Sequence, residues 1–270
     1  MDQLGSRLSP PAGRDRRGAV VTEALTLIDT WRDWGLPLVS RPRLIERIEV
    51  GKTNRNYRLQ APGLDEDLLL RINHPDPARL GIDRERERRI IDLTAQARLS
   101  RPYRHWDPAQ RFVVFPYLEG RTWTHADFED SKQTARLRQT LNRLHEIESP
   151  GTRRSYHAYL LDYWQRLEQA GRTDPALERA WRDFEPRLRA FDRGNWPARL
   201  VHHDLIPDNI LETTDGLCLI DWEYAAPGHP DIDVWTVDPA AVSEPFVAEM
   251  MDWINGLWER LIGLPEPNKP

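Results

Sequence analysis

Residues 200–211, LVHHDLIPDNIL, place two histidines, two aspartates and an asparagine between apolar residues at both ends. Polar groups this dense between apolar anchors predict a loop held by two buried segments. Three interpretations are open: a plain polar turn, a metal site on His202, His203 and Asp204, or a phosphoryl-transfer loop of the form H-x-D-x-x-x-x-N. The rest of the chain has to decide between them.

The segment after this loop predicts a short hairpin. NIL, ETTDG and LCLID read as strand, turn and strand, with Asp215-Gly216 as the turn signal. A hairpin brings its ends together, so Asn209 should lie beside Asp221, with Asp204 nearby. One carboxylate and one amide oxygen suit magnesium that holds phosphates, and the other carboxylate can accept a proton from an attacking hydroxyl. This pattern favours kinase-type phosphoryl transfer.

Composition limits the other classes of function. The chain has 270 residues, 39% hydrophobic and 30% charged, which is typical of a soluble globular protein. A net charge of -5 argues against a nucleic-acid partner, and no apolar run approaches the ~20 residues that span a bilayer. The N-terminus lacks the apolar core of a signal peptide. The single cysteine, Cys218, lies in an apolar run and is expected in the core of a cytoplasmic protein.

The chain divides into three predicted parts. Residues 1–18 are rich in Pro, Gly and Arg and are expected to be a disordered tail. Residues 19–119 read as a small strand-rich lobe with a helix in DRERERRIIDLTAQARL, and residues 120–270 as a larger helical lobe. The helices are expected at 128–148, 155–170, 174–192 and 242–262, and only 199–222 interrupts them with strands.

Several motifs together resemble a known family. HHDLIPDNIL followed by LIDWEYA is similar to the aminoglycoside phosphotransferase and choline kinase superfamily of small-molecule kinases. GKTNRNYRL resembles the phosphate loop of choline and ethanolamine kinases, whereas FVVFPYLEG and YLLDYWQRL look more like thiamine kinase. The resemblance covers about residues 40–240. It implies an α+β, bilobal protein-kinase-like fold, with a nucleotide-binding lobe before a helical catalytic and substrate lobe.

The resemblance assigns roles in the second lobe. Asp204 matches the catalytic aspartate, the general base. Asn209 and Asp221 match the two magnesium ligands. His202 matches the motif histidine, which braces the loop, and Asp233 resembles a downstream aspartate with a similar structural role. The implied cofactors are ATP and Mg²⁺.

In the first lobe, Arg71 stands where protein kinases have a phosphate-binding lysine. Arginine at this position resembles choline and thiamine kinases, and its planar fork can still bind phosphate. Glu87 is the expected helix partner of Arg71, with Glu85 as the competitor, because RERERR could also be a solvated face.

Other first-lobe residues are expected to contact the nucleotide. VGKTNR lacks the glycine spacing and the following helix of a P-loop, so Gly51, Thr53 and Asn54 are instead predicted to form a turn whose backbone N–H groups cover phosphates. FVVFPYLEG would bind adenine through the carbonyl of Pro116 and the N–H of Leu118. Pro116 itself has no N–H to donate.

The acceptor alcohol is predicted from the residues around LIDWEYA. The resemblance places Glu223 near the alcohol, where a carboxylate would suit a cationic nitrogen, with Trp222, Trp164 and Tyr163 as possible aromatic walls. The predicted function is therefore ATP- and magnesium-dependent phosphorylation of a small cationic alcohol. Thiamine is the first choice, and choline or ethanolamine follow.

Two alternatives remain at the level of sequence. One is an antibiotic-modifying phosphotransferase of the aminoglycoside type, and the other is a catalytically silent binding protein with a kinase fold. The intact set of Asp204, Asn209 and Asp221 argues against the silent protein. The expected partner is a small molecule, with no nucleic acid and no membrane; the sequence leaves the oligomeric state and the choice between ATP and GTP open.

Overall fold

A computed structural model describes residues 22–49, 53–149 and 151–261. The predicted tail at 1–18 and the phosphate-loop residue Gly51 lie outside these ranges. The chain separates into two units. Unit 1 comprises the residues up to Pro75 together with Pro102–Leu118, and unit 2 comprises Asp76–Arg101 and Glu119 onward.

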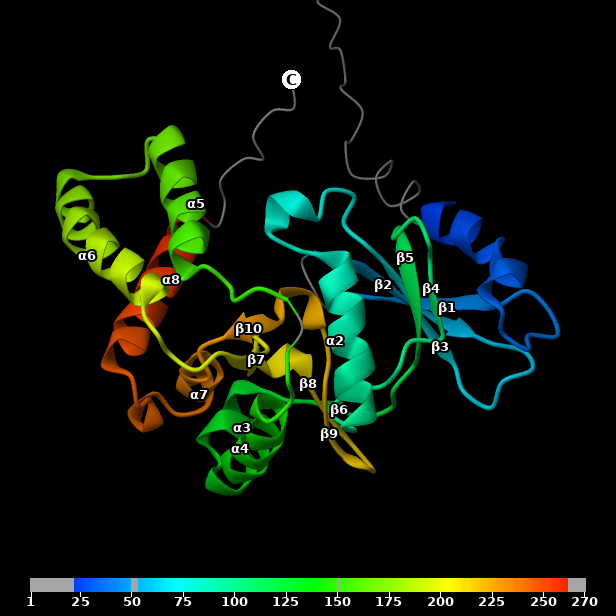
Figure 1. The fold of residues 1–270 in the computed structure, drawn as a ribbon. Coiled ribbons are helices and arrows are strands. Elements are labelled where there is room, and N and C mark those ends of the chain that lie inside the picture. The colour runs from blue at the N-terminus through cyan, green and yellow to red at the C-terminus, as the bar shows by residue number, and fades with distance from the viewer. Residues whose placement is uncertain (1–21, 50–52, 150, 262–270) are drawn as a thin grey trace, which may run out of the picture. The chain divides into compact units, whose positions relative to one another are not determined.

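Unit 1 is built on one antiparallel sheet (Figure 1). Its strand order is β1-β2-β3-β5-β4, so neighbouring strands in the sequence mostly pair with each other. Residues 22–28 are helical and precede the 3₁₀ helix η1 (Trp31–Trp34). The strands are β1 (Arg43–Ile48), β2 (Arg55–Gln60), β3 (Leu68–Ile72), β4 (His105–Trp106) and β5 (Phe112–Pro116).

Alternating apolar residues explain the sheet of unit 1. Tyr57 and Leu59 of β2 and Leu68 and Leu70 of β3 are fully buried, because every second side chain of a strand points to the same face. They pack with Ile28 of the preceding helical segment into one core. The sequence predicts strands within 43–60, 65–73 and 111–120, and these ranges are consistent with this sheet.

Unit 2 is mainly helical, and α5, α6 and α8 pack together in it (Figure 1). The longer helices begin with side-chain caps: Asp83, Asp130, Ser155 and Asp174 each accept hydrogen bonds from backbone N–H groups of the first turn. The helices are α2 (Arg84–Gln96), α3 (His125–Glu129), α4 (Ser131–His145), α5 (Tyr156–Gln169), α6 (Pro175–Arg193), α7 (Asp231–Val237) and α8 (Pro245–Leu261), with η2 (Ala78–Leu80) and η5 (Pro239–Ala241) as short 3₁₀ turns.

Two small sheets interrupt these helices. β8 (Ile210–Thr213) and β9 (Gly216–Leu219) form the predicted hairpin, and β6 (Arg121–Thr122) adds to its edge. β7 (Arg199–Val201) pairs with β10 (Ala226–Gly228). The sequence patterns missed β4, β6, β10 and α7, which are too short to show a periodicity.

The division between the units differs from the predicted one at α2. Residues 19–119 were expected to form one lobe, but Asp76–Arg101 group with unit 2. The contacts of this segment explain the grouping: the N–H of Leu219 donates to the carbonyl of Leu99 at 2.9 Å, and α2 contacts the η4 turn (Trp222–Tyr224). The helix that the sequence places in the first lobe is thus joined to the catalytic segment of the second.

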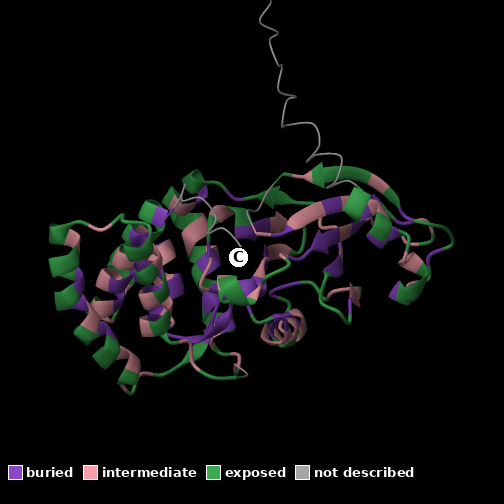
Figure 2. Cartoon of the chain, turned by 90° about the horizontal axis from the view of Figure 1, so that it is seen from above, coloured by how far each residue is buried: buried purple, intermediate pink, exposed green. Residues whose placement is uncertain are grey.

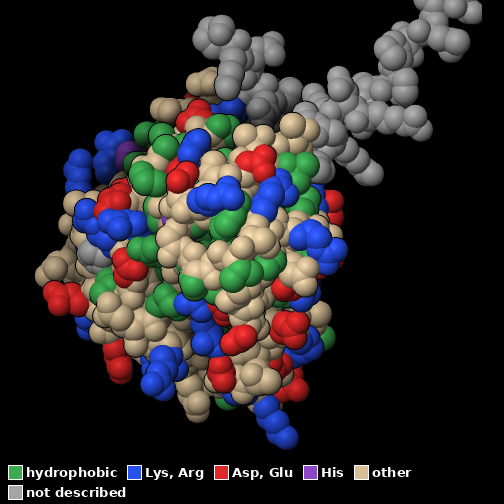
Figure 3. All heavy atoms as spheres, turned by 90° about the vertical axis from the view of Figure 1, so that its right-hand side faces the viewer, with side chains coloured by type: hydrophobic (Ala, Val, Ile, Leu, Met, Phe, Trp, Pro, Cys, Tyr) green, Lys and Arg blue, Asp and Glu red, His purple; other side chains and the backbone are tan. Residues whose placement is uncertain are grey.

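The fold class agrees with the prediction: an α+β chain with a strand-rich first unit and a mainly helical second unit. Buried residues follow the sheet and the inward faces of the helices (Figure 2). Acidic and basic side chains are interspersed on the face shown in Figure 3. Within the described ranges, the helices all fall short of the length and hydrophobicity that crossing a bilayer requires.

Candidate active site

The loop over 202–209 is anchored at both ends by buried apolar residues. Leu200 and Val201 of β7 and Ile210 of β8 have no exposed surface. The hairpin then returns the chain, with Ile210 opposite Leu219 and the turn closed at Gly216. The N–H of Ile220 donates to the carbonyl of Asn209 at 3.0 Å. Asn209 and the residue before Asp221 are therefore hydrogen-bonded neighbours, as the hairpin predicts.

Asp204 and Asn209 form the polar centre of the loop. The amide nitrogen Nδ2 of Asn209 donates to the backbone carbonyl of Asp204 at 2.8 Å and to its Oδ2 at 3.0 Å. Burial raises the pKa of Asp204 and nearby Glu223 adds to this effect, although His202 and the bond from Asn209 work against it. A raised pKa makes a carboxylate a better proton acceptor.

Asp233 holds the backbone at the start of the loop. Its Oδ2 accepts from the N–H of His202 at 3.0 Å, and its Oδ1 accepts from the N–H of His203 at 3.2 Å. His145 of α4 contacts Oδ2 at 3.2 Å. Burial would raise the pKa of Asp233, but these hydrogen bonds and the neighbouring histidines keep it below its ordinary value. This geometry is the bracing role expected for Asp233.

Both loop histidines are engaged within the protein. The Nε2 of His202 donates to the carbonyl of Ile220 at 3.0 Å, which ties the loop to the far strand of the hairpin. His203 has a left-handed backbone (φ 65°); its Nδ1 donates to the carbonyl of Val201 and its Nε2 lies 3.1 Å from the hydroxyl of Tyr156. These contacts give the histidines structural roles and do not support a metal site on them.

Asp221 follows the hairpin and begins the η4 turn. It has a left-handed backbone (φ 62°), a conformation that costs a non-glycine residue free energy and is retained mainly at functional sites. The next two side chains, Trp222 and Glu223, are buried, whereas Asp221 is only half-buried. The left-handed turn thus separates half-buried Asp221, whose Oδ1 is itself buried, from the buried residues after it.

The donors at this site fit magnesium. Both N–H groups of the Asn209 amide are directed at Asp204, so its oxygen is the atom left for a cation. An amide oxygen and the carboxylate of Asp221 are hard ligands, and magnesium completes its shell with phosphate oxygens and water. Within the described ranges no cluster of three or more His, Cys, Asp or Glu could hold a metal ion on its own.

Glu223 does not occupy the open position that the sequence analysis expected. Its side chain is 1% exposed, and its Oε2 accepts from the guanidinium of Arg84 at 3.0 Å. A buried carboxylate already paired with an arginine is not an open negative charge for a substrate cation. The expectation that Glu223 contacts the substrate is therefore wrong. The partner that buries Glu223 is an arginine 139 positions away in the sequence.

The same arginine binds Glu87. Nη1 of Arg84 donates to Oε2 of Glu87 at 2.7 Å, and the Glu87 side chain is fully buried. Glu85 instead pairs with Arg88 and Arg89 at the surface. RERERR therefore has one solvated face and one buried face. The i,i+3 spacing of Arg84 and Glu87 was the signal that could have identified the buried pair.

Two predicted aromatic walls lie in the core instead. Trp164 is 5% exposed and stacks on Trp181, with ring centroids 4.8 Å apart and planes 4° apart. Trp222 is also buried, and its indole N–H donates to the carbonyl of Leu219. Other protein groups cover both rings, so neither ring forms the wall of a substrate site.

Tyr159, Tyr163 and Trp258 form another aromatic row. The sequence predicts Tyr163 as a possible wall but does not identify the other two. The rings of Tyr159 and Tyr163 are 4.6 Å apart and their hydroxyls are hydrogen-bonded; Tyr163 stacks on Trp258 at 6.1 Å. Trp258 is one of the few large apolar side chains that is strongly exposed. Burial raises the pKa of Tyr159, and the negative charge of Asp204 adds to this effect.

The residues of unit 1 that are predicted to bind the nucleotide lie on β3, at the end of β5 and in the segments beside these strands. Arg71 of β3 is 5% exposed, and its Nε donates to Oδ1 of Asn73 at 3.1 Å. Asn54 is buried, and its Oδ1 accepts from the N–H of His74. Pro116 ends β5 opposite Leu68. Thr53 and Leu118 lie in the segments beside these strands and are half-buried.

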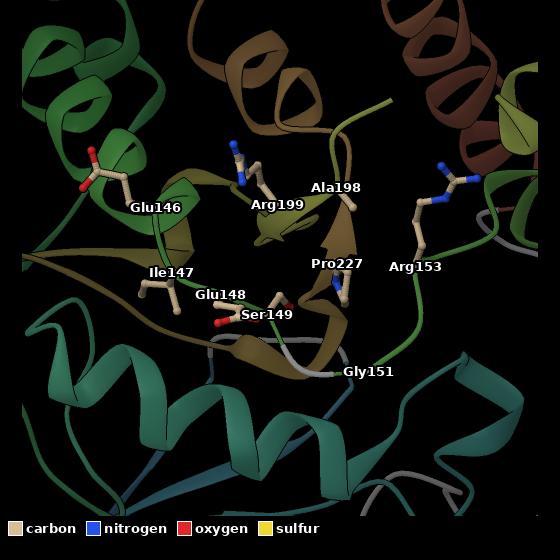
Figure 4. A pocket seen from close by; sticks show the side chains of 9 residues that line it. All are labelled: Glu146, Ile147, Glu148, Ser149, Gly151, Arg153, Ala198, Arg199 and Pro227. Carbon is tan, nitrogen blue, oxygen red and sulfur yellow. The ribbon is translucent and has the colours of Figure 1, made fainter. Parts of the chain in front are cut away.

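A separate pocket of about 550 Å³ lies in unit 2 (Figure 4). It contains none of the predicted site residues, so it is distinct from the catalytic loop. Its lining comes from the segment after α4, the start of β7 and β10, namely Glu146, Ile147, Glu148, Ser149, Gly151, Arg153, Ala198, Arg199 and Pro227.

A two-unit α+β fold with a braced H-x-D-x-x-x-x-N loop and a following aspartate defines a kinase-like class of protein. A family model described as a phosphotransferase enzyme family matches residues 44–261. The chain belongs to this family.

Curated relatives include thiamine kinases of Salmonella paratyphi B and Salmonella newport, each 34% identical over 135 residues. The alignment covers 47% of this chain and 44% of each relative, so the chain spans less than half the length of the curated relatives it matches.

Solved structures extend the likeness of fold to most of the chain. A choline/ethanolamine kinase family protein from Mesorhizobium loti is 21% identical with a TM-score of 0.62, covering 89% of this chain and 85% of that one. Choline kinase LicA from Streptococcus pneumoniae is 19% identical with a TM-score of 0.62, covering 92% of both chains. At these identities the likeness shows the fold alone.

Proposed function

We propose that the protein is an ATP- and magnesium-dependent phosphotransferase that phosphorylates the hydroxyl group of a small cationic alcohol. The observation that carries this proposal is the Asp204–Asn209 contact. Asp233 holds the start of its loop, and the hairpin bonds Asn209 to Ile220, the residue before Asp221. Membership of the phosphotransferase enzyme family supports the reaction class. The soluble, cytoplasmic setting expected from the sequence would suit such an enzyme.

In this proposal Asp204 orients the acceptor hydroxyl and accepts its proton. Its raised pKa favours that role, because a carboxylate near the hydroxyl is then a stronger base. Asn209 and Asp221 hold magnesium, which supplies positive charge to the phosphates when it is bound. His202 and Asp233 keep the loop in place and do not touch the reacting atoms.

The nucleotide would be bound by the residues assigned in unit 1. Arg71 is the phosphate-binding side chain, and Thr53, Asn54 and Gly51 supply the turn over the phosphates. The carbonyl of Pro116 and the N–H of Leu118 would bind adenine. Glu87, which the sequence assigns to the same nucleotide set, lies on α2 in unit 2 and is held there by its buried ion pair with Arg84.

Thiamine is the first choice of acceptor, followed by choline and ethanolamine. Similarity to thiamine kinases and to a choline kinase supports a cationic alcohol. The aromatic row of Tyr159, Tyr163 and Trp258 supports it physically, since aromatic faces attract cations and stack on flat rings. The row takes the place of Glu223, Trp222 and Trp164, which are buried.

The test is a panel of acceptors with ADP release as the readout. Wild-type protein is assayed with ATP, Mg²⁺ and, in turn, thiamine, choline, ethanolamine and an aminoglycoside. We expect the highest kcat/KM with one of the three cationic alcohols, and the phosphorylated product should appear in the mass spectrum. Turnover with the aminoglycoside alone would identify an antibiotic-modifying enzyme, and no turnover with any acceptor would favour a silent binding protein.

A further inference from the structure

A fully buried arginine connects α2 to the segment that carries Asp221. Nη1 of Arg84 lies 2.7 Å from Oε2 of Glu87 and 3.0 Å from Oε2 of Glu223. The three side chains have exposed fractions of 1%, 0% and 1%. All three belong to unit 2.

The contact between Arg84 and Glu223 bears on the position of Asp221, because the two carboxylates lie in the same short turn of the chain. Glu223 is in the η4 turn (Trp222–Tyr224), which begins directly after the left-handed residue Asp221. Only Trp222 separates the proposed metal ligand Asp221 from the carboxylate that Arg84 holds, so a displacement of Glu223 would reach Asp221 through one short turn.

A second contact holds the other end of the same segment. The N–H of Leu219 donates to the carbonyl of Leu99 at 2.9 Å, just beyond the end of α2. The segment from Leu219 to Glu223 is therefore fixed at its start by the end of the α2 region and at its end by the first residue of α2, Arg84. Asp221 lies between the two attachment points.

Arg84 differs from the other arginines of this helix. Arg88 and Arg89 pair with Glu85 at the surface, where their side chains are 39% and 60% exposed. Exposed pairs of this kind contribute little to stability or geometry, because water competes for both charges. A buried guanidinium between two carboxylates has no such competition, and its Nη1 donates to both partners.

We infer that Arg84 is a positioning residue for phosphoryl transfer. By holding Glu223 it keeps the η4 turn, and with it the carboxylate of Asp221, in the place from which Asp221 binds the magnesium–nucleotide complex. This inference rests on the proposed function and assigns to Glu223 a role behind the metal ligand, in place of contact with the substrate.

Two variants test the inference, with a matched control. Glu223→Gln keeps the shape of the side chain and leaves the Arg84–Glu87 pair intact. Arg84→Lys keeps the charge but replaces the planar guanidinium, whose Nη1 donates to both carboxylates, with a compact ammonium group on a different stem. Arg89→Met, on the exposed face of the same helix, is the control. The readouts are ATP binding by calorimetry with and without Mg²⁺, the Mg²⁺ concentration for half-maximal ADP release, and the melting temperature.

We expect Glu223→Gln to raise the half-saturating Mg²⁺ concentration by about 10-fold or more, the effect typical of residues that orient a metal ligand. Arg84→Lys should act in the same direction with a smaller rise. ATP affinity without Mg²⁺ should stay within about twofold, since the change acts through the metal ligand. Arg89→Met should match the wild type in every readout.

Three results would overturn the inference. The first is an unchanged Mg²⁺ requirement in both variants, with only a lower melting temperature, which would make the pair merely structural. The second is a higher KM for the alcohol at unchanged Mg²⁺ requirement, which would return Glu223 to the substrate. The third is a wild-type protein whose ATP binding does not respond to Mg²⁺, and that result would also remove the proposed function.

Discussion

Four carboxylates in and around the catalytic loop have different surroundings, and these surroundings separate their roles. Asp233 is buried and accepts backbone N–H groups, Glu223 is buried and paired with Arg84, and Asp208 is exposed. Asp204 alone combines a raised pKa with a contact to Asn209. The same functional group, a carboxylate, thus holds the loop backbone, pairs with Arg84, lies at the surface and serves as the proposed base.

The first prediction concerns Asp204. Asp204→Asn should keep the fold, because an amide oxygen can still accept the hydrogen bond that Asn209 donates. It removes the proton acceptor, so kcat should fall by about 10²-fold or more, the usual contribution of a positioned base. ATP affinity should be unchanged. Asp208→Asn, an exposed change in the same loop, should leave kcat at the wild-type value, and equal kcat values for the two variants would remove Asp204 from its role.

The second prediction concerns His203 and pH. Burial, aided by the charge of Arg154, holds the pKa of His203 well below its ordinary value of 6.5, although Asp233 opposes this. The folded protein therefore keeps His203 neutral while the unfolded chain binds a proton below about pH 6.5, so stability is present above this pH and is lost as pH falls. The loss from this one group should grow steadily as pH falls below 6.5.

The variant that tests this effect is His203→Asn, because asparagine tolerates the left-handed backbone at φ 65°. Its free energy of unfolding should fall less between pH 7.5 and 5.5 than that of the wild type, measured by urea denaturation at each pH. His125→Asn removes an exposed histidine and should leave the slope unchanged. Parallel slopes for His203→Asn and the wild type would contradict the prediction.

At the residue scale, the sequence predicts what spacing controls and misses what distant contacts control. Asp204, Asn209 and Asp221 are linked by one loop and one hairpin, so their proximity follows from local pattern. Glu223 and Trp164 depend on Arg84 and Trp181, which lie on other helices. A carboxylate or an indole next to a motif looks the same in the sequence whether a substrate or a distant side chain covers it.

At the scale of elements, long periodic segments were predictable and short ones were not. The hairpin β8–β9 and the helices α4, α5, α6 and α8 lie close to their predicted ranges. β10 has three residues, and its pairing with β7 gives no sequence pattern. It nonetheless supports the catalytic loop, because its last residue, Gly228, lies against the side chains of His203 and Tyr156.

The third prediction tests this support. A Cβ atom at Gly228 would lie 2.6 Å from Nε2 of His203 and 2.6 Å from the hydroxyl of Tyr156. Gly228→Ala should therefore displace the loop and cost about 1–3 kcal/mol of stability, as overpacking does. A lower melting temperature and a lower kcat are expected. Gly256→Ala in α8, where a Cβ meets nothing within 4 Å, should melt at the wild-type temperature or above it, and equal melting of both variants would contradict the steric argument.

At the scale of the whole molecule, the family and the fold follow from the chain, but the acceptor does not. The family model and the solved structures cover most of the residues. In our proposal the acceptor is bound by side chains of α5 and α8, and the pairing of these helices depends on how segments far apart in sequence pack. Net charge and composition carry no information about that pairing.

The last prediction concerns the aromatic row that we assign to the acceptor. Trp258 is 43% exposed and stacks on Tyr163, so Trp258→Leu removes a ring face while keeping an apolar side chain. A ring face contributes about 0.5–2 kcal/mol to binding a cation, so KM for the preferred cationic alcohol should rise about 2- to 30-fold. KM for ATP should stay unchanged. The measurement is steady-state kinetics on thiamine, choline and ethanolamine beside a melting curve, with Trp31→Leu in unit 1 as the control. If Trp258 only packs against Tyr163, the melting temperature falls while KM for every alcohol stays at its wild-type value, and the aromatic row is then not the acceptor site.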